Sequence, residues 1–316
     1  MSYRFINPGY RDMFEGNAGK QVTGNKTYNP NNGVAFSGAG YGGTRASYTV
    51  KESENLYVSF GWYIPADYYD SMFSTNTILS VSALKVSTAT FRINIYSKPP
   101  QNFAISFEKL GNDHSKDTTI DFDPNLYKGS YNRFYVHMSS NDGSVEVWMN
   151  GKMVARQEGL AFKGEKITGN VVFLSGYYAD HMFLSNFIIS DEHVAPNEDV
   201  MLLPAGAVEA PSSKNEDGTY TLRNAGEEIL QVTDASVLKD TDIITGLAAI
   251  AAPGYTKGDG IYYMRGVVKD KEGKETLHDT VAIGSHEQGV IGVGWTENMS
   301  RSQLDGLKIG LRAEAE

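Results

Sequence analysis

Apolar residues alternate with polar ones in a series of short runs along the first two hundred residues. In the run LYVSFGWYIP, residues 56–65, the even positions from Leu56 to Ile64 share one face of a strand. Further runs follow at intervals of about 8–12 residues, separated by Gly, Asn, Asp or Pro. Among them are TILSVSALKV, ATFRINIYSK, FAISFEKL, RFYVHMSS, NVVFLSGYY and MFLSNFIISDEHV. This spacing is typical of a β-sandwich or barrel, and no long stripe of helical period interrupts it.

The clearest local signal is the stretch VEVWMNGKMV, residues 145–154. Its first half alternates between two sets of side chains: Val145, Val147 and Met149 on one face, Glu146 and Trp148 on the other. Asn150-Gly151 is the favoured pair for a two-residue type I′ turn, because both central residues need positive φ. The stretch therefore predicts a β-hairpin, one of the last pairs that close the sheet.

A change in composition near residue 200 marks a domain boundary. The segment VMLLPAGAVEAPSSKNEDGTYTL carries two prolines and a polar cluster, so we place the boundary within residues 203–213. We expect an all-β fold, with a β-sandwich in residues 1–203 and a smaller β domain in residues 204–316. Strands of the second domain are predicted by ILQVTDASVL, IITGLAAIAAP, IYYMRGVVKD, ETLHDTVAIG, GVIGVGWT and LKIGLRAE.

One short helical element is expected near the end of the sequence, in WTENMSRSQLDGLKIGL. Thr296 and Ser300 are the candidate N-caps, because a side-chain oxygen at that position accepts a hydrogen bond from the first helical turn. Residues 302–304 form the turn, Asp305-Gly306 ends it, and a last strand follows.

Residues before Tyr48 are poor in aliphatic side chains and rich in Gly and Asn, as in GNAGKQVTGNKTYNPNNGVAFSGAGYGGT. We interpret this segment as a loop-rich edge of the sandwich with short strands. The alternative is an arm that becomes ordered only against a partner.

The chain is acidic, with a formal net charge of −10 over 316 residues. Such a surface repels nucleic acid, and no basic stripe offsets it, so nucleic acid is not an expected partner. The absence of cysteine excludes disulfides and thiolate metal sites. No run approaches the ~20 apolar residues of a membrane span, and no signal-peptide-like segment begins the sequence. We therefore expect synthesis in the cytoplasm and no membrane insertion.

The sequence lacks the familiar catalytic patterns. A glycoside hydrolase on a β-sandwich needs two carboxylates on one strand face, and neither E-x-D-x-x-E nor E-x-D-x-E occurs. Glu146 is the nearest candidate, and we interpret it as a solvated carboxylate beside an aromatic ring. No G-x-S-x-G elbow, H-x-x-x-H pair or phosphate-binding loop is present. We therefore predict a protein that is not an enzyme.

Calcium is the one cofactor for which the sequence offers candidate ligands. The stretch GNDHSKDTTIDFD offers hard oxygen ligands, and Asp113, Asp117 and Asp121 are the candidate metal ligands. No EF-hand spacing is present. The alternative, which we favour, is a polar loop with solvated carboxylates, so no cofactor is predicted.

Aromatic side chains gather in two regions that we expect to be loops, WYIPADYYDSMF and GYYADHMF. Their candidate ligand-binding residues are Trp62, Tyr63, Tyr68, Tyr69, Tyr177 and Tyr178. Such rings form a platform on which sugar rings stack or a partner protein docks. The alternative is that these loops cover the ends of the sandwich core with aromatic side chains.

The order of these features resembles bacteriophage and prophage virion proteins in which a concanavalin A-like or laminin-G-like sandwich precedes a smaller β domain. The resemblance rests on the hairpin, on NVVFLSG and FLSNFIISDEHV after it, and on the connector Leu202-Leu203-Pro204. In the second domain the matching positions are Trp295-Thr296, Leu304, Gly306-Leu307 and Ile309-Gly310-Leu311. This resemblance implies a lectin-like jelly roll in the first domain.

The resemblance further implies a non-enzymatic structural virion protein of a tailed phage or prophage, on the tail or the capsid surface. Its expected partners are other virion proteins and further copies of itself, and its expected location is the virion, after synthesis in the host cytoplasm. A module that binds host surface glycan is the first alternative. The second is a glycan-cleaving enzyme that depends on Glu146.

Overall fold

The structure, a computed structural model, describes residues 4–15, 19–37, 44–66, 76–86, 89–98, 102–110, 118–122, 128–160, 162–176, 182–204, 206–209, 222, 224–251, 262–283 and 290–314. The chain forms two compact units. The first is built from Asn7–Met201, and the second from Leu202–Glu316 together with Tyr3–Ile6 near the N-terminus. The predicted boundary after residue 203 lies close to this division. The prediction placed the whole N-terminal segment in the first domain, whereas Arg4, Phe5 and Ile6 group with the second unit.

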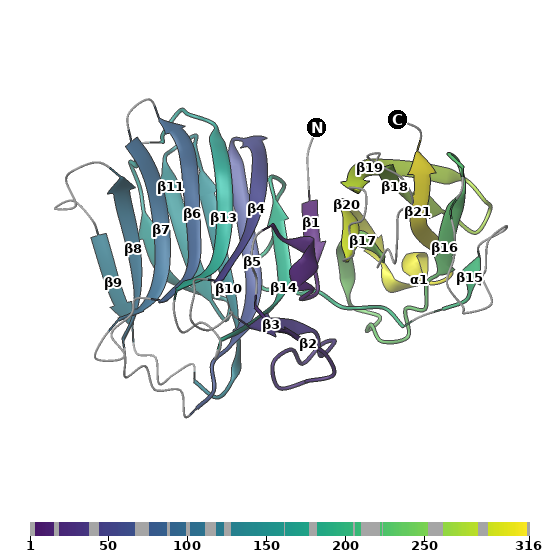
Figure 1. Ribbon diagram of the computed structural model, residues 1–316, viewed down its shortest axis with the longest axis horizontal. Coiled ribbons are helices and arrows are strands. Elements are labelled where there is room, and N and C mark those ends of the chain that lie inside the picture. The colour runs from purple at the N-terminus through teal and green to yellow at the C-terminus, as the bar shows by residue number, and fades with distance from the viewer. Residues whose placement is uncertain are drawn as a thin grey trace. The chain divides into compact units, whose positions relative to one another are not determined.

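Two antiparallel sheets face each other in the first unit (Figure 1). The first sheet follows the order β12 (Lys152–Gln157), β11 (Ser144–Met149), β10 (Tyr131–Ser139), β5 (Asn55–Tyr63), β14 (Phe183–Ser190), β3 (Ala35–Ser37) and β2 (Gln21–Val22). The second sheet follows the order β4 (Thr44–Ser53), β13 (Ile167–Gly176), β6 (Asn76–Val86), β7 (Ala89–Lys98), β8 (Asn102–Leu110) and β9 (Thr118–Phe122). A short 3₁₀ turn, η1 (Arg11–Met13), precedes β2.

The core of the first unit lies between the two sheets and is rich in phenylalanine. Phe173 of β13 packs edge-on against Phe60 of β5, with ring centroids 5.2 Å apart, and against Phe187 of β14, at 4.9 Å. The even positions of β5 and the following residue, from Leu56 to Ile64, are all buried to within 1% exposure. The predicted inward face of this strand is therefore confirmed.

The second unit contains a five-stranded sheet and a two-stranded pair. The sheet follows the order β15 (Val208–Glu209), β16 (Glu228–Val232), β21 (Lys308–Glu314), β18 (Tyr262–Lys269) and β19 (Glu275–Ile283). The pair is β17 (Ile243–Ala251) with β20 (Ile291–Ser300). The first residues of β1 (Arg4–Asn7) group with this unit, although β1 pairs with β14 of the first sheet. Its core gathers around Trp295, with Leu247, Val293, Leu304 and Leu311.

The single described α-helical turn, α1 (Arg301–Leu304), lies where the sequence predicts it, and Ser300 is its N-cap. The Gln303 side chain accepts a hydrogen bond of 2.9 Å from the Ser300 backbone amide, which completes a capping box. The prediction of an all-β fold, a lectin-like sandwich followed by a second β unit, is confirmed. None of the helices in the described ranges has the length and apolar character needed to cross a membrane.

The predicted hairpin is formed by β11 and β12. Asn150 and Gly151 have φ values of 51° and 74°, as a type I′ turn requires. The inward set Val145, Val147 and Met149 is buried, with at most 2% exposure. The Asn150 side chain also accepts a hydrogen bond from the backbone amide of Arg133, at 2.8 Å, so the turn is tied to β10.

We expect Gly151→Val to lower the free energy of unfolding by about 1–3 kcal/mol, because a β-branched residue is strained at positive φ. A Cβ at Gly151 would meet no atom within 4 Å, so backbone strain alone would cause the loss. Gly151→Asn is the matched control, since Asn tolerates this region. Urea denaturation of both variants measures the effect, and equal stability of Gly151→Val and the natural chain would contradict it.

Candidate functional site

The outer face of the first sheet carries aromatic and charged side chains in register across three strands. Because neighbours on a strand point to opposite faces, burying Phe134 and Val136 turns Tyr135 and His137 outward. Tyr135 lies opposite Trp148, and His137 lies opposite Glu146 on one side and Tyr57 on the other. The register therefore brings together side chains that are far apart in sequence.

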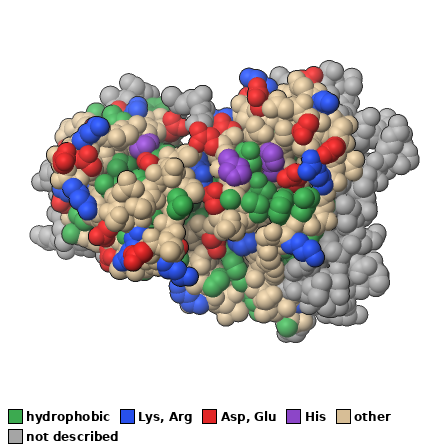
Figure 2. Space-filling view, turned by 180° about the vertical axis from the view of Figure 1, so that it is seen from behind, with side chains coloured by type: hydrophobic (Ala, Val, Ile, Leu, Met, Phe, Trp, Pro, Cys, Tyr) green, Lys and Arg blue, Asp and Glu red, His purple; other side chains and the backbone are tan. Residues whose placement is uncertain are grey.

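These side chains form a connected set of rings, which we call the ring row: Trp148, Tyr135 and Tyr57 follow one another, and His137 and His193 both contact Tyr57. The Trp148 and Tyr135 ring centroids are 6.5 Å apart and perpendicular, and those of Tyr135 and Tyr57 are 6.4 Å apart. Tyr57 stacks in parallel on His137 at 4.4 Å and meets His193 edge-on at 5.6 Å. Figure 2 shows hydrophobic side chains gathered beside histidines on the first unit, in the right half of the view.

The rings of the ring row differ in exposure: two are nearly buried and three are accessible to solvent. Tyr57 and Tyr135 are only 9% and 4% exposed, whereas Trp148 and His137 are half-buried and His193 is exposed. The Trp148 Nε1 atom is buried, so the indole ring offers only carbon atoms to solvent. The accessible part of the row is therefore the surface of Trp148, His137 and His193, which lie beside the two buried tyrosines.

Polar groups border the ring row along its length. The Glu146 carboxylate lies 4.0 Å from His137 Nδ1 and forms an ion pair of 3.0 Å with Arg156. Arg156 pairs in addition with Glu158, at 2.6 Å. On the other side, His137 Nε2 lies 3.3 Å from the Asn55 side-chain oxygen. A ligand on the row would thus find hydrogen-bond acceptors and donors beside the rings.

Burial sets the protonation of the ring row. Desolvation lowers the pKa of His137, and the Glu146 carboxylate opposes this without cancelling it. Desolvation also raises the pKa of Tyr57 and of Tyr135, and the nearby Glu146 charge acts in the same direction. At neutral pH the row therefore carries a neutral imidazole at His137 and protonated phenols, which can donate hydrogen bonds.

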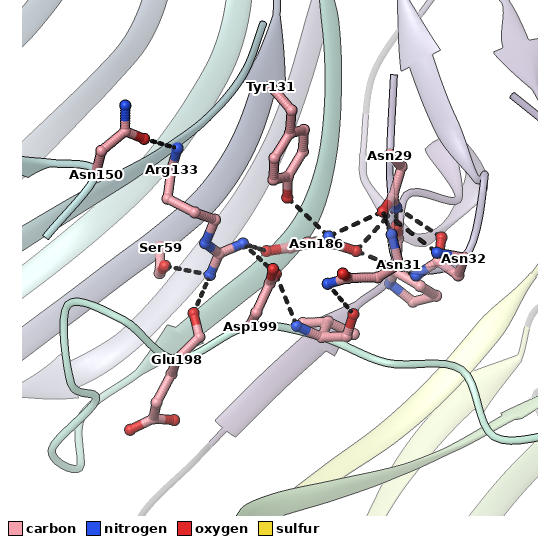
Figure 3. Close-up of polar contacts among 12 residues, drawn as sticks. Asn29, Asn31, Asn32, Ser59, Tyr131, Arg133, Asn150, Asn186, Glu198 and Asp199 are labelled. Atoms are coloured by element: carbon pink, nitrogen blue, oxygen red, sulfur yellow. Dashed lines mark hydrogen bonds and ion pairs between the residues drawn. The ribbon is translucent and has the colours of Figure 1, made fainter. Parts of the chain in front are cut away.

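The Arg133 guanidinium fixes the segment that follows β14 against the first sheet (Figure 3). It donates hydrogen bonds to the Asn186 and Glu198 backbone oxygens, at 2.7 and 2.5 Å, and to Ser59 Oγ at 2.6 Å. It also forms an ion pair with Asp199, at 2.9 Å, and its side chain is 11% exposed. This segment carries His193, so Arg133 holds one end of the ring row in place.

A second set of contacts extends this network to the N-terminal loop (Figure 3). The Asn29 and Asn186 side-chain amides form a reciprocal pair of hydrogen bonds, 2.9 and 3.0 Å long, and both residues are fully buried. Asn186 Nδ2 also donates to the Tyr131 hydroxyl at 2.7 Å. Asn31 donates to the Val200 backbone oxygen at 3.1 Å, so the segment is held from both sides.

The residues predicted as an aromatic platform do not form one surface among the described residues. Trp62 is fully buried in the core, so its ring offers no face to a ligand at the surface. Tyr63 ends β5 and lies near Tyr28 and Phe183, with ring centroids 5.2 and 6.5 Å away. Four candidates lie outside the described residues: Tyr68, Tyr69, Tyr177 and Tyr178.

The predicted calcium ligands are described only in part. Asp113 and Asp117 lie outside the described residues, and Asp121 pairs with Ala104 in the strand ladder between β9 and β8. Across the described ranges, no group of three acidic or histidine side chains is arranged to hold a metal ion. The expectation of no cofactor, with calcium as the alternative, stays a prediction.

Comparisons with known proteins show no family for this chain. No family model and no curated protein matches the sequence. Similar solved structures include an endo-β-1,4-glucuronan lyase from the fungus Trichoderma reesei, with 12% identity and a TM-score of 0.43 over 61% of this chain and 98% of the lyase. A basic winged bean lectin with Tn-antigen matches with 8% identity and a TM-score of 0.41, over 60% of this chain and 98% of the lectin. A heptameric pentraxin from Limulus polyphemus matches with 16% identity and a TM-score of 0.33, over 56% of this chain and 76% of the pentraxin.

The sequence analysis excluded enzymatic activity, and this prediction is wrong. It rested on missing sequence patterns, and the similar structures include a polysaccharide lyase. At 12% identity the similarity shows the fold alone and assigns no activity to this chain.

We expect Arg133→Met to lower the free energy of unfolding by about 2 kcal/mol, because it leaves two carbonyl oxygens without their donor and the partly exposed Asp199 carboxylate without its ion-pair partner. Arg156→Met is the matched control, since the Arg156 side chain is 46% exposed and ion pairs at the surface contribute little to stability. Urea denaturation of both variants measures the difference. Equal losses in the two variants would contradict the role given to Arg133.

The lowered pKa of His137 predicts a stability that depends on pH. The unfolded chain binds a proton near pH 6.5, whereas the folded protein resists it, so the contribution of His137 is complete above that value. It is lost as the pH falls from 6.5 toward the lower pKa of the folded state. We expect His137→Gln to flatten this part of the stability profile. An NMR titration that gives His137 a pKa of 6.5 or above would contradict the prediction.

Proposed function

We propose that the protein binds carbohydrate on the ring row of the first sheet. The observation that carries this proposal is the set of rings on one sheet face, bordered by the polar side chains of Glu146 and Asn55. The apolar faces of sugar rings pack against aromatic carbon, and sugar hydroxyl groups need the hydrogen-bonding groups that border it. Both kinds of group are present here within one surface.

The way the row is built favours binding over a purely structural role. Trp148 and His137 contact the buried rings of Tyr135 and Tyr57 beside them on the same sheet face, so the accessible rings are held before a ligand arrives. A site on strands loses less conformational entropy on binding than a site on loops. Arg133 adds to this by fixing the segment that carries His193.

The charges around the row favour an uncharged glycan. Arg156 is already paired with Glu146 and Glu158, so an anionic sugar would have to displace a carboxylate to reach it. The chain as a whole carries a net charge of −10, which adds a general repulsion of anions. We therefore expect neutral sugars to bind more tightly than uronic or sialic acids.

The roles expected from the sequence resemblance remain predictions. A virion component that presents the ring row to host surface glycan would combine them with the proposed binding. Mass spectrometry of gradient-purified particles tests the virion location: peptides of this chain at stoichiometric level would support it, and their absence from particles would contradict it. Calcium dependence is tested by repeating glycan binding with and without the ion.

Glycan binding should depend on the row and not on aromatic side chains elsewhere. We expect the natural chain to bind neutral glycans on an array, and Trp148→Ala to weaken that binding at least about tenfold. Tyr263→Ala, which removes a half-buried ring of the second unit, is the control and should bind like the natural chain. Thermal denaturation shows whether each variant is folded. An array with no binding, or unchanged affinity in folded Trp148→Ala, would contradict the proposal.

A further inference from the structure

The edge strand β12 ends the first sheet beside the ring row. It pairs with β11, and none of the described strands lies on its other side. It carries Met153, which is 39% exposed, whereas Met138 and Met149 on the two neighbouring strands have at most 2% exposure. A single exposed apolar side chain is common at a protein surface, so exposure alone indicates no function for Met153.

A β-bulge in β12 turns Met153 toward the face that carries the ring row. Val147 lies opposite Ala155, and the next residue, Trp148, lies opposite Met153, so Val154 is the extra residue of the bulge. Ala155 is 5% exposed and faces the core with Val147. Strict alternation from Ala155 would place Val154 on the outer face and Met153 on the inner one. The bulge reverses this order, and bulges at sheet edges commonly redirect a side chain in this way.

Met153 therefore extends the accessible part of the ring row by one strand. Side chains directly opposite one another on one face have Cβ atoms about 4.5–5.5 Å apart, so Met153 lies next to the half-buried Trp148. The thioether is flexible and polarisable, which suits it to contact with a ligand. Arg156, on the same strand, is paired with Glu146 and Glu158, so the extension also has polar groups beside it.

The extended row is longer than one sugar ring. Adjacent strands lie about 4.8 Å apart, so the path from His137 on β10 across Trp148 on β11 to Met153 on β12 covers roughly 10 Å or more. At its other end the row meets the segment that carries His193, which Arg133 holds in place. At the β12 end the described part of the sheet stops, so a ligand that lies along the row can continue past Met153.

We infer that Met153 is a carbohydrate-binding residue and that the ligand is a chain of several neutral sugar units, which lies across the strands and continues past β12. This inference rests on the proposed carbohydrate binding and adds the length and direction of the ligand. The first units of the chain contact His137 and Trp148, and a following unit contacts Met153. A single terminal sugar would not reach from one end of this surface to the other.

Chain length tests the inference, with cello-, manno-, xylo- and chito-oligosaccharides of two to six units as probes. The series that binds best on an array is used for calorimetric titration of the natural chain. We expect the tetrasaccharide to bind at least about fivefold more tightly than the disaccharide, because the longer chain also covers Met153. Equal affinity for the two lengths would overturn the inference and leave carbohydrate binding intact, whereas no binding to any array member would contradict both.

Met153→Ala isolates the contribution of this side chain. We expect the variant to bind the tetrasaccharide about fivefold more weakly than the natural chain does, and the disaccharide equally well. Met201→Ala is the matched control, since Met201 is also 39% exposed and lies outside the ring row, and it should bind both probes like the natural chain. Thermal denaturation shows whether each variant is folded. An unchanged tetrasaccharide affinity in folded Met153→Ala, or an equal loss for both probes, would overturn the role of Met153.

NMR of the methionine methyl groups gives a readout on the natural chain, which does not depend on the folding of a variant. We expect the Met153 methyl signal to shift during titration with the tetrasaccharide and to stay in place with the disaccharide. The Met201 methyl signal should stay in place with both. A tetrasaccharide complex in which the Met153 signal is unchanged would overturn the inference.

Discussion

The alternation of side chains across the first sheet is the constraint on which both the core and the ring row depend. Phe60 and Phe134 are buried between the two sheets, and the residues next to them in sequence must therefore face outward. A register slip of one residue would place Tyr135 in the core and Phe134 at the surface. The burial of the phenylalanine side chains therefore also determines which side chains form the ring row on the outer face. The same strands that build the core position the candidate site.

A second constraint comes from polar groups that are buried beside the row. Hydrogen bonds between protein groups join the N-terminal loop, β14 and the segment after β14. They are made by Asn29, Asn186 and Arg133. Groups of this kind destabilise a fold when one partner is missing and specify one arrangement when all partners are present. The position of His193 at the end of the row follows from this network, and not from the sheet register alone.

Local features of the fold were predictable from the sequence, and contacts between distant segments were not. The two-residue period of β5, the Asn150-Gly151 turn and the Ser300 cap each depend on neighbouring residues, and the structure has all three. The ring row requires knowing that Tyr57 lies opposite His137 and that His137 lies opposite Glu146. An alternating pattern predicts which face of the sheet a side chain lies on, but not which strand lies next to it. The predicted ligand-binding residues were therefore placed in the loops.

The central claim is that a glycan binds on the ring row, and NMR of the tryptophan indole groups tests it most directly. The chain has three tryptophans, Trp62 in the first core, Trp148 on the row and Trp295 in the second unit. During titration with a glycan chosen from an array, the account predicts a saturable shift of the Trp148 indole signal and an unchanged Trp295 signal. A bound glycan that leaves the Trp148 signal in place would contradict it.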